Sequence, residues 1–165
     1  MSPILQEDDL DFLSHGEGQT TRLGERLGPL LQAGDVVCLQ GPLGSGKTRF
    51  AQGIGRGMGV QGILASPSYM IVNEYHPPSG PALYHLDFYR LHDAEFPGFD
   101  PEEYIGGNGV AVIEWPERCP SLIPALALWL TFRYVGETKR GLLMRAHGDR
   151  YRELLRAFRR AAFGV

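Results

Sequence analysis

The chain has 165 residues, of which 43% are hydrophobic and 21% are charged, and its formal net charge is −3. This length predicts one domain over residues 1–165, and the composition favours a loop-rich globular protein over a disordered one. The longest apolar run, 122–130, contains a proline and is too short to span a membrane.

The start of the chain is acidic and has no apolar signal core, so we expect a cytoplasmic protein. The only cysteines are Cys38 and Cys119, and they lack the CxxC spacing of a zinc site. Cys38 belongs to a short apolar run, which predicts a buried thiol rather than a disulfide.

The first part of the chain predicts four elements. In chain order they are a short strand at 4–5, a helix at 20–31, a buried strand at 36–39 and a helix at 48–58. A glycine-rich loop joins the last two. Gly53, Gly55 and Gly57 would weaken the second helix in isolation.

The second part of the chain predicts five strands and a terminal helix. The strands are expected at 70–75, 83–86, 110–113, 127–134 and 142–146, and the helix at about 150–163. Strands and helices alternate around the glycine-rich loop. This order predicts an α/β fold of three layers, similar to P-loop NTPases, with a largely parallel central sheet flanked by helices.

Positive charge is concentrated at the end of the chain. Residues 137–165 contain eight Lys or Arg against three Asp or Glu, although the whole chain is acidic. A basic segment on an acidic body indicates a contact with RNA, an acidic partner or the nucleotide. A solvated helix face is the alternative, and the sequence leaves both open.

The strongest motif is G-x-x-x-x-G-K-[ST], which follows an apolar strand and precedes a helix. In such a loop, backbone N–H groups converge on phosphate oxygens, and the helix N-terminus adds its positive dipole end. Lys47 is expected to bind the β- and γ-phosphates, and Thr48 to offer its hydroxyl to Mg²⁺. The predicted nucleotide-binding residues are Gly41, Pro42, Leu43, Gly44, Ser45, Gly46, Lys47 and Thr48.

Two carboxylates, Asp87 and Glu114, follow apolar strands, where an open α/β sheet places its ligand site. Each is a candidate to hold Mg²⁺ directly or through water, or to orient the attacking water. Asp after a strand is otherwise a common cap or turn residue. His85 alone is typical of a packed or capping histidine.

The loop motif alone does not select a reaction. The chain lacks both the DxxG and NKxD motifs of a regulatory GTPase. The loop also fits the form found in small metabolite and nucleotide kinases, but no arginine-rich lid pattern is evident. A metabolite kinase and a nucleotide-sensing adaptor without turnover remain the alternatives.

Four segments together resemble one known family. GPLGSGKTRFAQGIGRGMGV, SPSYMIVNEY, YHLDFYRL and VIEWPE, in that order, are similar to TsaE, a small bacterial ATPase. That family is needed to make threonylcarbamoyladenosine at position 37 of tRNAs reading codons that begin with A. The resemblance runs from about residue 20 to 124, and YHLDFYRL and VIEWPE are more specific than the loop.

The resemblance implies ATP and Mg²⁺ as cofactors, with Thr48 and Glu114 as metal ligands. It implies that Asp87 is a second acidic residue required for hydrolysis and that Trp115 stands beside the metal glutamate. Residues 66–69 correspond to a nucleotide-responsive switch, in which Ser68 replaces the usual threonine.

The resemblance also implies weak ATPase activity that depends on partner proteins. These partners are TsaB and TsaD, which transfer the threonylcarbamoyl group to tRNA. Contact of this chain with tRNA is expected to be indirect, or weak through the basic C-terminal segment. The choice of ATP over GTP rests on the resemblance, because no motif in the sequence reads the base.

Overall fold

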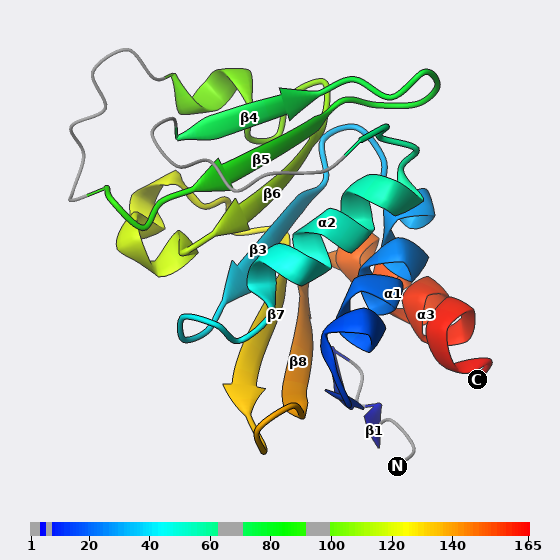
Figure 1. Ribbon diagram of the computed structural model, residues 1–165. Helices are drawn as coiled ribbons and strands as arrows, with labels where there is room; N and C mark the ends of the chain where they lie inside the picture. The colour runs from blue at the N-terminus through cyan, green and yellow to red at the C-terminus, as the bar shows by residue number, and fades with distance from the viewer. Residues whose placement is uncertain (1–3, 6–7, 63–70, 92–99) are drawn as a thin grey trace.

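The structure, a computed structural model, describes residues 4–5, 8–62, 71–91 and 100–165 (Figure 1). Eight strands form one sheet in the order β1-β2-β8-β7-β3-β6-β5-β4. The strands are β1 (Ile4–Leu5), β2 (Asp9–Ser14), β3 (Val36–Gln40), β4 (Val72–Tyr75), β5 (Leu83–Asp87), β6 (Val110–Glu114), β7 (Ala127–Tyr134) and β8 (Arg140–His147). The α-helices are α1 (Glu17–Leu27), α2 (Lys47–Gly57) and α3 (Asp149–Phe163).

The centre of the sheet is parallel and its edges are antiparallel. Strands β5, β6, β3 and β7 pair in parallel, whereas β4, β8 and β1 run against their neighbours. Since β2 is antiparallel to β8, it runs in the same direction as the central strands. Five of the eight strands therefore share one direction, and the predicted α/β class with a largely parallel sheet is confirmed.

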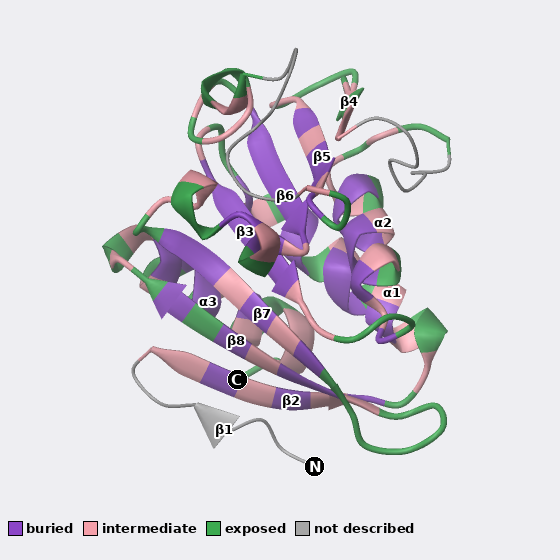
Figure 2. Ribbon diagram, turned by 90° about the vertical axis from the view of Figure 1, so that its left-hand side faces the viewer, coloured by how far each residue is buried: buried purple, intermediate pink, exposed green. Residues whose placement is uncertain are grey.

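The two faces of the sheet are covered differently. All three α-helices pack on one face, where their apolar side chains join those of the strands in the larger core (Figures 1 and 2). In the part of the chain that the structure describes, short 3₁₀ turns and loops cover the other face, among them Pro116–Arg118 and Pro120–Leu122. The predicted covering layers are thus α-helical on one side only.

Strand β2 has no counterpart among the sequence-based predictions. Its side chains alternate, with Leu10, Phe12 and Ser14 buried and the residues between them half-buried. This two-residue period is the signal of a strand with one covered face. The acidic residues Asp9 and Asp11 obscure this signal in the sequence. In the fold, Asp9 pairs with Arg145 on the adjacent strand β8, and Asp11 pairs with Arg133 on β7, one strand further.

Helices α1 and α2 approach each other at glycines. A Cβ atom on Gly53 would lie 2.0 Å from the Thr21 carbonyl oxygen, and one on Gly24 would lie 2.3 Å from that of Phe50. One turn further along, a Cβ atom on Gly28 or Gly57 would lie 2.5 Å from the carbonyl oxygen of Ile54 or Glu25, respectively. The glycines that weaken α2 as an isolated helix therefore allow its backbone to lie against that of α1, which fixes the helix that follows the loop.

Helix α3 belongs to the core. Tyr151, Leu154, Leu155 and Phe158 are buried under the sheet, as their helical spacing predicts. The Tyr151 hydroxyl accepts a hydrogen bond from the Val36 N–H at the start of β3. No helix in the described ranges is both long enough and apolar enough to cross a membrane.

Candidate functional site

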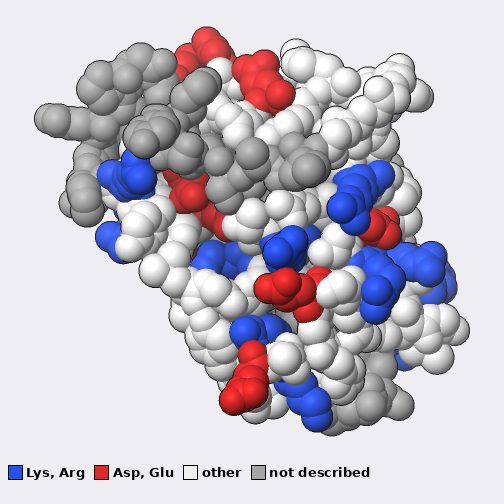
Figure 3. Space-filling model, viewed as in Figure 1, with Lys and Arg blue, Asp and Glu red and all other residues white. Residues whose placement is uncertain are grey.

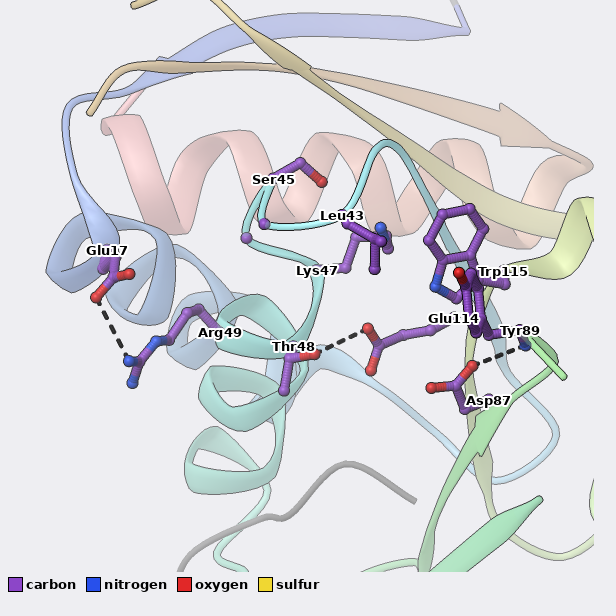
Figure 4. A pocket seen from close by; sticks show the side chains of 12 residues that line it. Glu17, Leu43, Ser45, Lys47, Thr48, Arg49, Asp87, Tyr89, Glu114 and Trp115 are labelled. Atoms are coloured by element: carbon purple, nitrogen blue, oxygen red, sulfur yellow. Dashed lines mark hydrogen bonds and ion pairs between the residues drawn. The ribbon is translucent and has the colours of Figure 1, made fainter. Parts of the chain in front are cut away.

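The predicted phosphate loop connects β3 to α2 and lies at the carboxyl end of the parallel strands (Figure 4). Three of its glycines have positive φ, 152° at Gly41, 74° at Gly44 and 108° at Gly46, a region that other residues rarely adopt. Gly46 is the N-cap of α2, so the free N–H groups of the first helical turn face the loop. The loop therefore has the backbone needed for a phosphate cradle.

Lys47 lies between the loop and an aromatic ring. Its Nζ donates to the Gly41 and Pro42 carbonyl oxygens and lies 4.2 Å from the centre of the Trp115 ring. Burial lowers the pKa of this lysine, although the nearby Glu114, Glu117 and Asp87 oppose the shift. A phosphate would offer this buried ammonium a stronger partner than carbonyl groups do.

Glu114, at the end of β6, is hydrogen-bonded through both of its carboxylate oxygens. Oε1 accepts from the Thr48 hydroxyl at 2.9 Å, and Oε2 lies 2.6 Å from His85 Nε2 (Figure 4 shows the first contact). Glu114 is only 3% exposed and His85 is fully buried. Hydrogen bonds thus connect the hydroxyl and the carboxylate predicted to hold the metal, Thr48 and Glu114, to His85.

Asp87 lies beside Glu114 because β5 and β6 pair in parallel, with Asp87 and Glu114 as register partners. Its Oδ1 accepts a hydrogen bond from the Tyr89 N–H at 2.9 Å. Desolvation raises the pKa of Asp87, with a smaller increase from Glu114, while the Tyr89 N–H, His85 and Lys47 lower it. Two carboxylates therefore face one site at the sheet edge.

Trp115 has a left-handed backbone conformation, with φ 58° and ψ 46°. Apart from glycines, it is the one described residue with positive φ. A non-glycine residue in this region costs energy, and such residues gather at functional sites. The conformation turns the chain sharply after Glu114 and brings the indole against Lys47 and the Tyr89 ring, whose centroid is 4.9 Å away.

These side chains line one pocket of about 320 Å³. Its lining residues are Glu17, Leu43, Gly44, Ser45, Gly46, Lys47, Thr48, Arg49, Asp87, Tyr89, Glu114 and Trp115 (Figure 4). Within the described residues, no three His, Cys, Asp or Glu side chains cluster as a closed metal site. A hydroxyl and two carboxylates fit Mg²⁺, which completes its oxygen shell with phosphate and water.

A second hollow of about 340 Å³ borders the other side of the loop and shares Glu17, Gly44, Ser45 and Gly46 with the first. Its remaining walls come from the start of α1 and from the turn between β7 and β8. Tyr134 Oη donates to the Leu43 carbonyl oxygen, and Arg140 donates to that of Gly44 and lies over the Tyr134 ring. Hydrogen bonds from the β7–β8 hairpin therefore stabilise the solvent-facing part of the loop.

Most of the predicted site residues meet at this edge of the sheet. Gly41 and Pro42 contribute the carbonyl oxygens that hold Lys47, whereas Ser68 lies outside the described residues. The sequence reasoning missed Glu17, Arg49 and Tyr89, which line the pocket. Arg49 follows the loop motif directly, so its place in the sequence was a usable signal. No feature of the sequence indicates Glu17, because only tertiary packing brings α1 to the loop. The Glu17 carboxylate lies 3.4 Å from the Arg49 guanidinium.

Asp87→Asn is expected to raise the melting temperature of the metal-free, nucleotide-free protein at pH 7. Burial raises the pKa of Asp87 in the folded chain, so its ionisation at neutral pH lowers stability. The gain should shrink as pH falls through the folded pKa and vanish below the unfolded one. Thermal unfolding of both proteins in EDTA across this range is the measurement. A less stable variant at pH 7 would mean that the contacts of the charged form outweigh the cost of its burial.

Residues 14–142 match a family model described as threonylcarbamoyl adenosine biosynthesis protein TsaE. A tRNA threonylcarbamoyladenosine biosynthesis protein TsaE from a Synechocystis species is 42% identical over 72% of this chain and 77% of its own length. The Bacillus subtilis protein of the same name is 35% identical over 82% of this chain and 85% of its own. The crystal structure of Bacillus subtilis YdiB superposes with a TM-score of 0.81 at 28% identity, covering 92% of this chain and 95% of that one.

Proposed function

Because the chain belongs to the TsaE family, we propose that it binds and hydrolyses ATP with Mg²⁺ in the threonylcarbamoylation of tRNA. One observation carries the proposal. The Thr48 hydroxyl of the phosphate loop is hydrogen-bonded to Glu114, and both line the pocket that also contains Lys47 and Asp87. A loop hydroxyl and a strand-end carboxylate are the pair that holds Mg²⁺ in P-loop NTPases.

The position of each residue in the pocket suggests its role. The N–H groups of the loop and the ammonium of Lys47 bind the β- and γ-phosphates, which requires Lys47 to exchange its carbonyl partners for phosphate oxygens. Thr48 and Glu114 hold Mg²⁺, which neutralises charge on the phosphates. Asp87 is placed to hold the metal directly or to position the attacking water. Trp115 covers Lys47 and limits its access to water.

The two hollows beside the loop suggest how the nucleotide is oriented. Asp87 and Glu114 line only the first hollow, so the γ-phosphate and Mg²⁺ belong there. Both hollows share Gly44, Ser45 and Gly46, where the phosphate chain would cross. The nucleoside then lies in the second hollow, between the start of α1 and the β7–β8 turn.

The proposed partners are TsaB and TsaD, with tRNA contacted weakly or through them. In α3, Arg150 pairs with Asp35, and Arg152 pairs with Asp8 and Asp149, so these two arginines are used inside the fold. Figure 3 shows basic side chains gathered over α1 and α3. These two helices carry five arginines without an ion pair to a described carboxylate: Arg22, Arg26, Arg156, Arg159 and Arg160.

The tRNA contact is tested by substituting arginines of this set rather than by removing α3. Removing α3 would strip four buried side chains from the core, so truncation would unfold the protein rather than isolate a basic tail. Substituting Arg156 and Arg160 by Ala keeps the core. If the set binds tRNA, the double variant should bind more weakly than wild type and with a shallower salt dependence. Identical salt curves would contradict the contact.

We expect phosphate release from Mg-ATP to be slow for the protein alone and to rise when the TsaB–TsaD complex is added. The reason is that the pocket contains metal and phosphate ligands but no lid for a small acceptor in the described part of the chain. The measurement is a continuous phosphate assay over a titration of the complex, with Lys47→Ala as the inactive control because it lacks the phosphate ammonium.

Other outcomes of this assay identify the alternatives. Phosphorylation of a small metabolite without stimulation by the complex would indicate a kinase. Partner binding that requires ATP but never releases phosphate would indicate an adaptor. The cytoplasmic location remains a prediction.

A further inference from the structure

We propose that His85 is a positioning residue, which orients the Glu114 carboxylate for Mg²⁺ by hydrogen-bonding Oε2, the carboxylate oxygen on the buried side. The inference rests on the proposed function, since it assigns a role beside the same metal site. Sequence alone predicts only a packed or capping histidine at this position. The case for more than packing comes from the contact itself, from its burial and from the register of the two strands.

The contact between His85 and Glu114 is short and fully enclosed. His85 Nε2 lies 2.6 Å from Glu114 Oε2, and the two side chains are 0% and 4% exposed. A carboxylate oxygen only accepts hydrogen bonds, so the ring presents Nε2–H to it. A buried carboxylate needs such donors, because burying it without partners is costly. His85 therefore supplies one of the two hydrogen bonds that hold Glu114 in place.

The other hydrogen bond to Glu114 comes from a metal-binding hydroxyl. Thr48 donates to Oε1, on the side of the carboxylate that faces the pocket. Thr48 and Oε1 are the groups that would hold Mg²⁺, and the contact of His85 with Oε2 engages neither of them. His85 would thus keep the carboxylate aimed at the loop, and would prevent it from turning toward the neighbouring Lys47.

The spacing His-x-Asp follows from this geometry. Residues two apart on a strand point to the same face, so His85 and Asp87 both project toward α2. Asp87 is the register partner of Glu114, and His85 pairs with Val112, one step back along β6. One residue therefore stands beside Glu114 at the pocket, and the other supports its carboxylate from the buried side.

Packing alone does not explain a histidine here. Its Nδ1 is buried and has no hydrogen-bond partner among the described residues. A ring that only filled space would be replaced at no polar cost by an apolar side chain of similar volume. Nε2, the ring nitrogen that has a hydrogen-bond partner, contacts Glu114. This contact therefore explains why a polar ring stands at position 85.

Two amide substitutions separate positioning from packing. The amide nitrogen of Gln at position 85 can reach the place of Nε2, whereas the shorter Asn reaches only the place of Nδ1. Both variants are polar and neutral, and they differ mainly in whether they touch Glu114. Val112→Ala is the control for core damage, because Val112 is buried on the same face and is the register partner of His85.

The experiment measures metal binding rather than turnover. Mn²⁺ is titrated by electron paramagnetic resonance into protein saturated with a non-hydrolysable ATP analogue, and analogue binding is measured separately in EDTA. His85→Asn should weaken Mn²⁺ binding by about 10- to 100-fold, the usual effect of losing a ligand-orienting partner. His85→Gln and Val112→Ala should stay within about threefold of wild type, and metal-free analogue binding should be similar in all four proteins.

The measured affinities distinguish three cases. Equal Mn²⁺ affinity in His85→Asn and wild type would overturn the role of His85 while leaving the proposed function intact. Equal losses in Asn and Gln variants, or a parallel loss of metal-free binding, would assign His85 to packing. A wild-type protein that binds no analogue, or binds it without any effect of Mn²⁺, would overturn the proposed function and this inference with it.

Discussion

Glu114→Gln is expected to release phosphate from Mg-ATP at least about 100-fold more slowly than wild type when the TsaB–TsaD complex is present. The substitution keeps the size of the side chain and removes the charge that faces Thr48 and the pocket. A neutral amide is a poor Mg²⁺ ligand, so the variant would bind Mg²⁺ weakly. The negative charge on the phosphates would then be less well neutralised during hydrolysis. ATP binding in EDTA should change little, because the loop and Lys47 remain.

Glu102→Gln is the matched control for this variant. It removes the same charge from an exposed side chain that does not line the pocket and is not among the carboxylates that act on Lys47. Its turnover should stay within about threefold of wild type, since exposed charges contribute little. Turnover of Glu114→Gln near the wild-type rate would remove Glu114 from the metal site and leave Asp87 as the principal acidic residue.

Gly53→Ala is expected to lower the free energy of unfolding by about 2 to 3 kcal/mol, which corresponds to a melting temperature roughly 5 to 10 °C lower. The added methyl group would lie 2.0 Å from the Thr21 carbonyl oxygen, and backbone atoms cannot rotate away. The two helices would have to separate. Chemical denaturation followed by circular dichroism measures the change.

The same substitution elsewhere on this helix pair gives the control. A Cβ atom on Gly18 of α1 meets only the tip of the Arg22 side chain, at 3.3 Å. Gly18→Ala should therefore be neutral or stabilise by up to about 1 kcal/mol through helix propensity. A Gly53→Ala protein as stable as Gly18→Ala would show that the helices tolerate a wider separation. Because α2 begins at Lys47, Gly53→Ala should also weaken ATP binding.

Local patterns were sufficient for the central elements and for the loop. Strands β3 and β6 are short apolar runs that end in polar residues, and a parallel sheet buries such runs on both faces. Helix α3 shows its buried face as a helical repeat of apolar side chains. Helix α1 begins three residues before the predicted start at residue 20, because its first turn is polar and its burial begins at Thr20.

Other features depended on partners that are distant in sequence. The acidic pattern of β2 is compatible with a strand only because arginines from β7 and β8 lie beside it. The glycines of α2 oppose a helix until α1 is placed against them. The basic C-terminal segment predicts an anionic partner or a solvated helix face, yet two of its arginines form ion pairs with Asp35 and Asp8 of the same chain.

The sequence by itself determined the glycine-rich loop, the two strand-end carboxylates and the family. These features are encoded in contiguous residues, whose backbone preferences and spacing do not need the rest of the chain. Only the tertiary structure decided that Glu114 is held between Thr48 and His85, and that Lys47 lies under Trp115. The physical reason is strand order. Placing β6 between β3 and β5 brings side chains 29 and 66 residues apart from Glu114 into hydrogen-bond contact, and no local pattern specifies that adjacency.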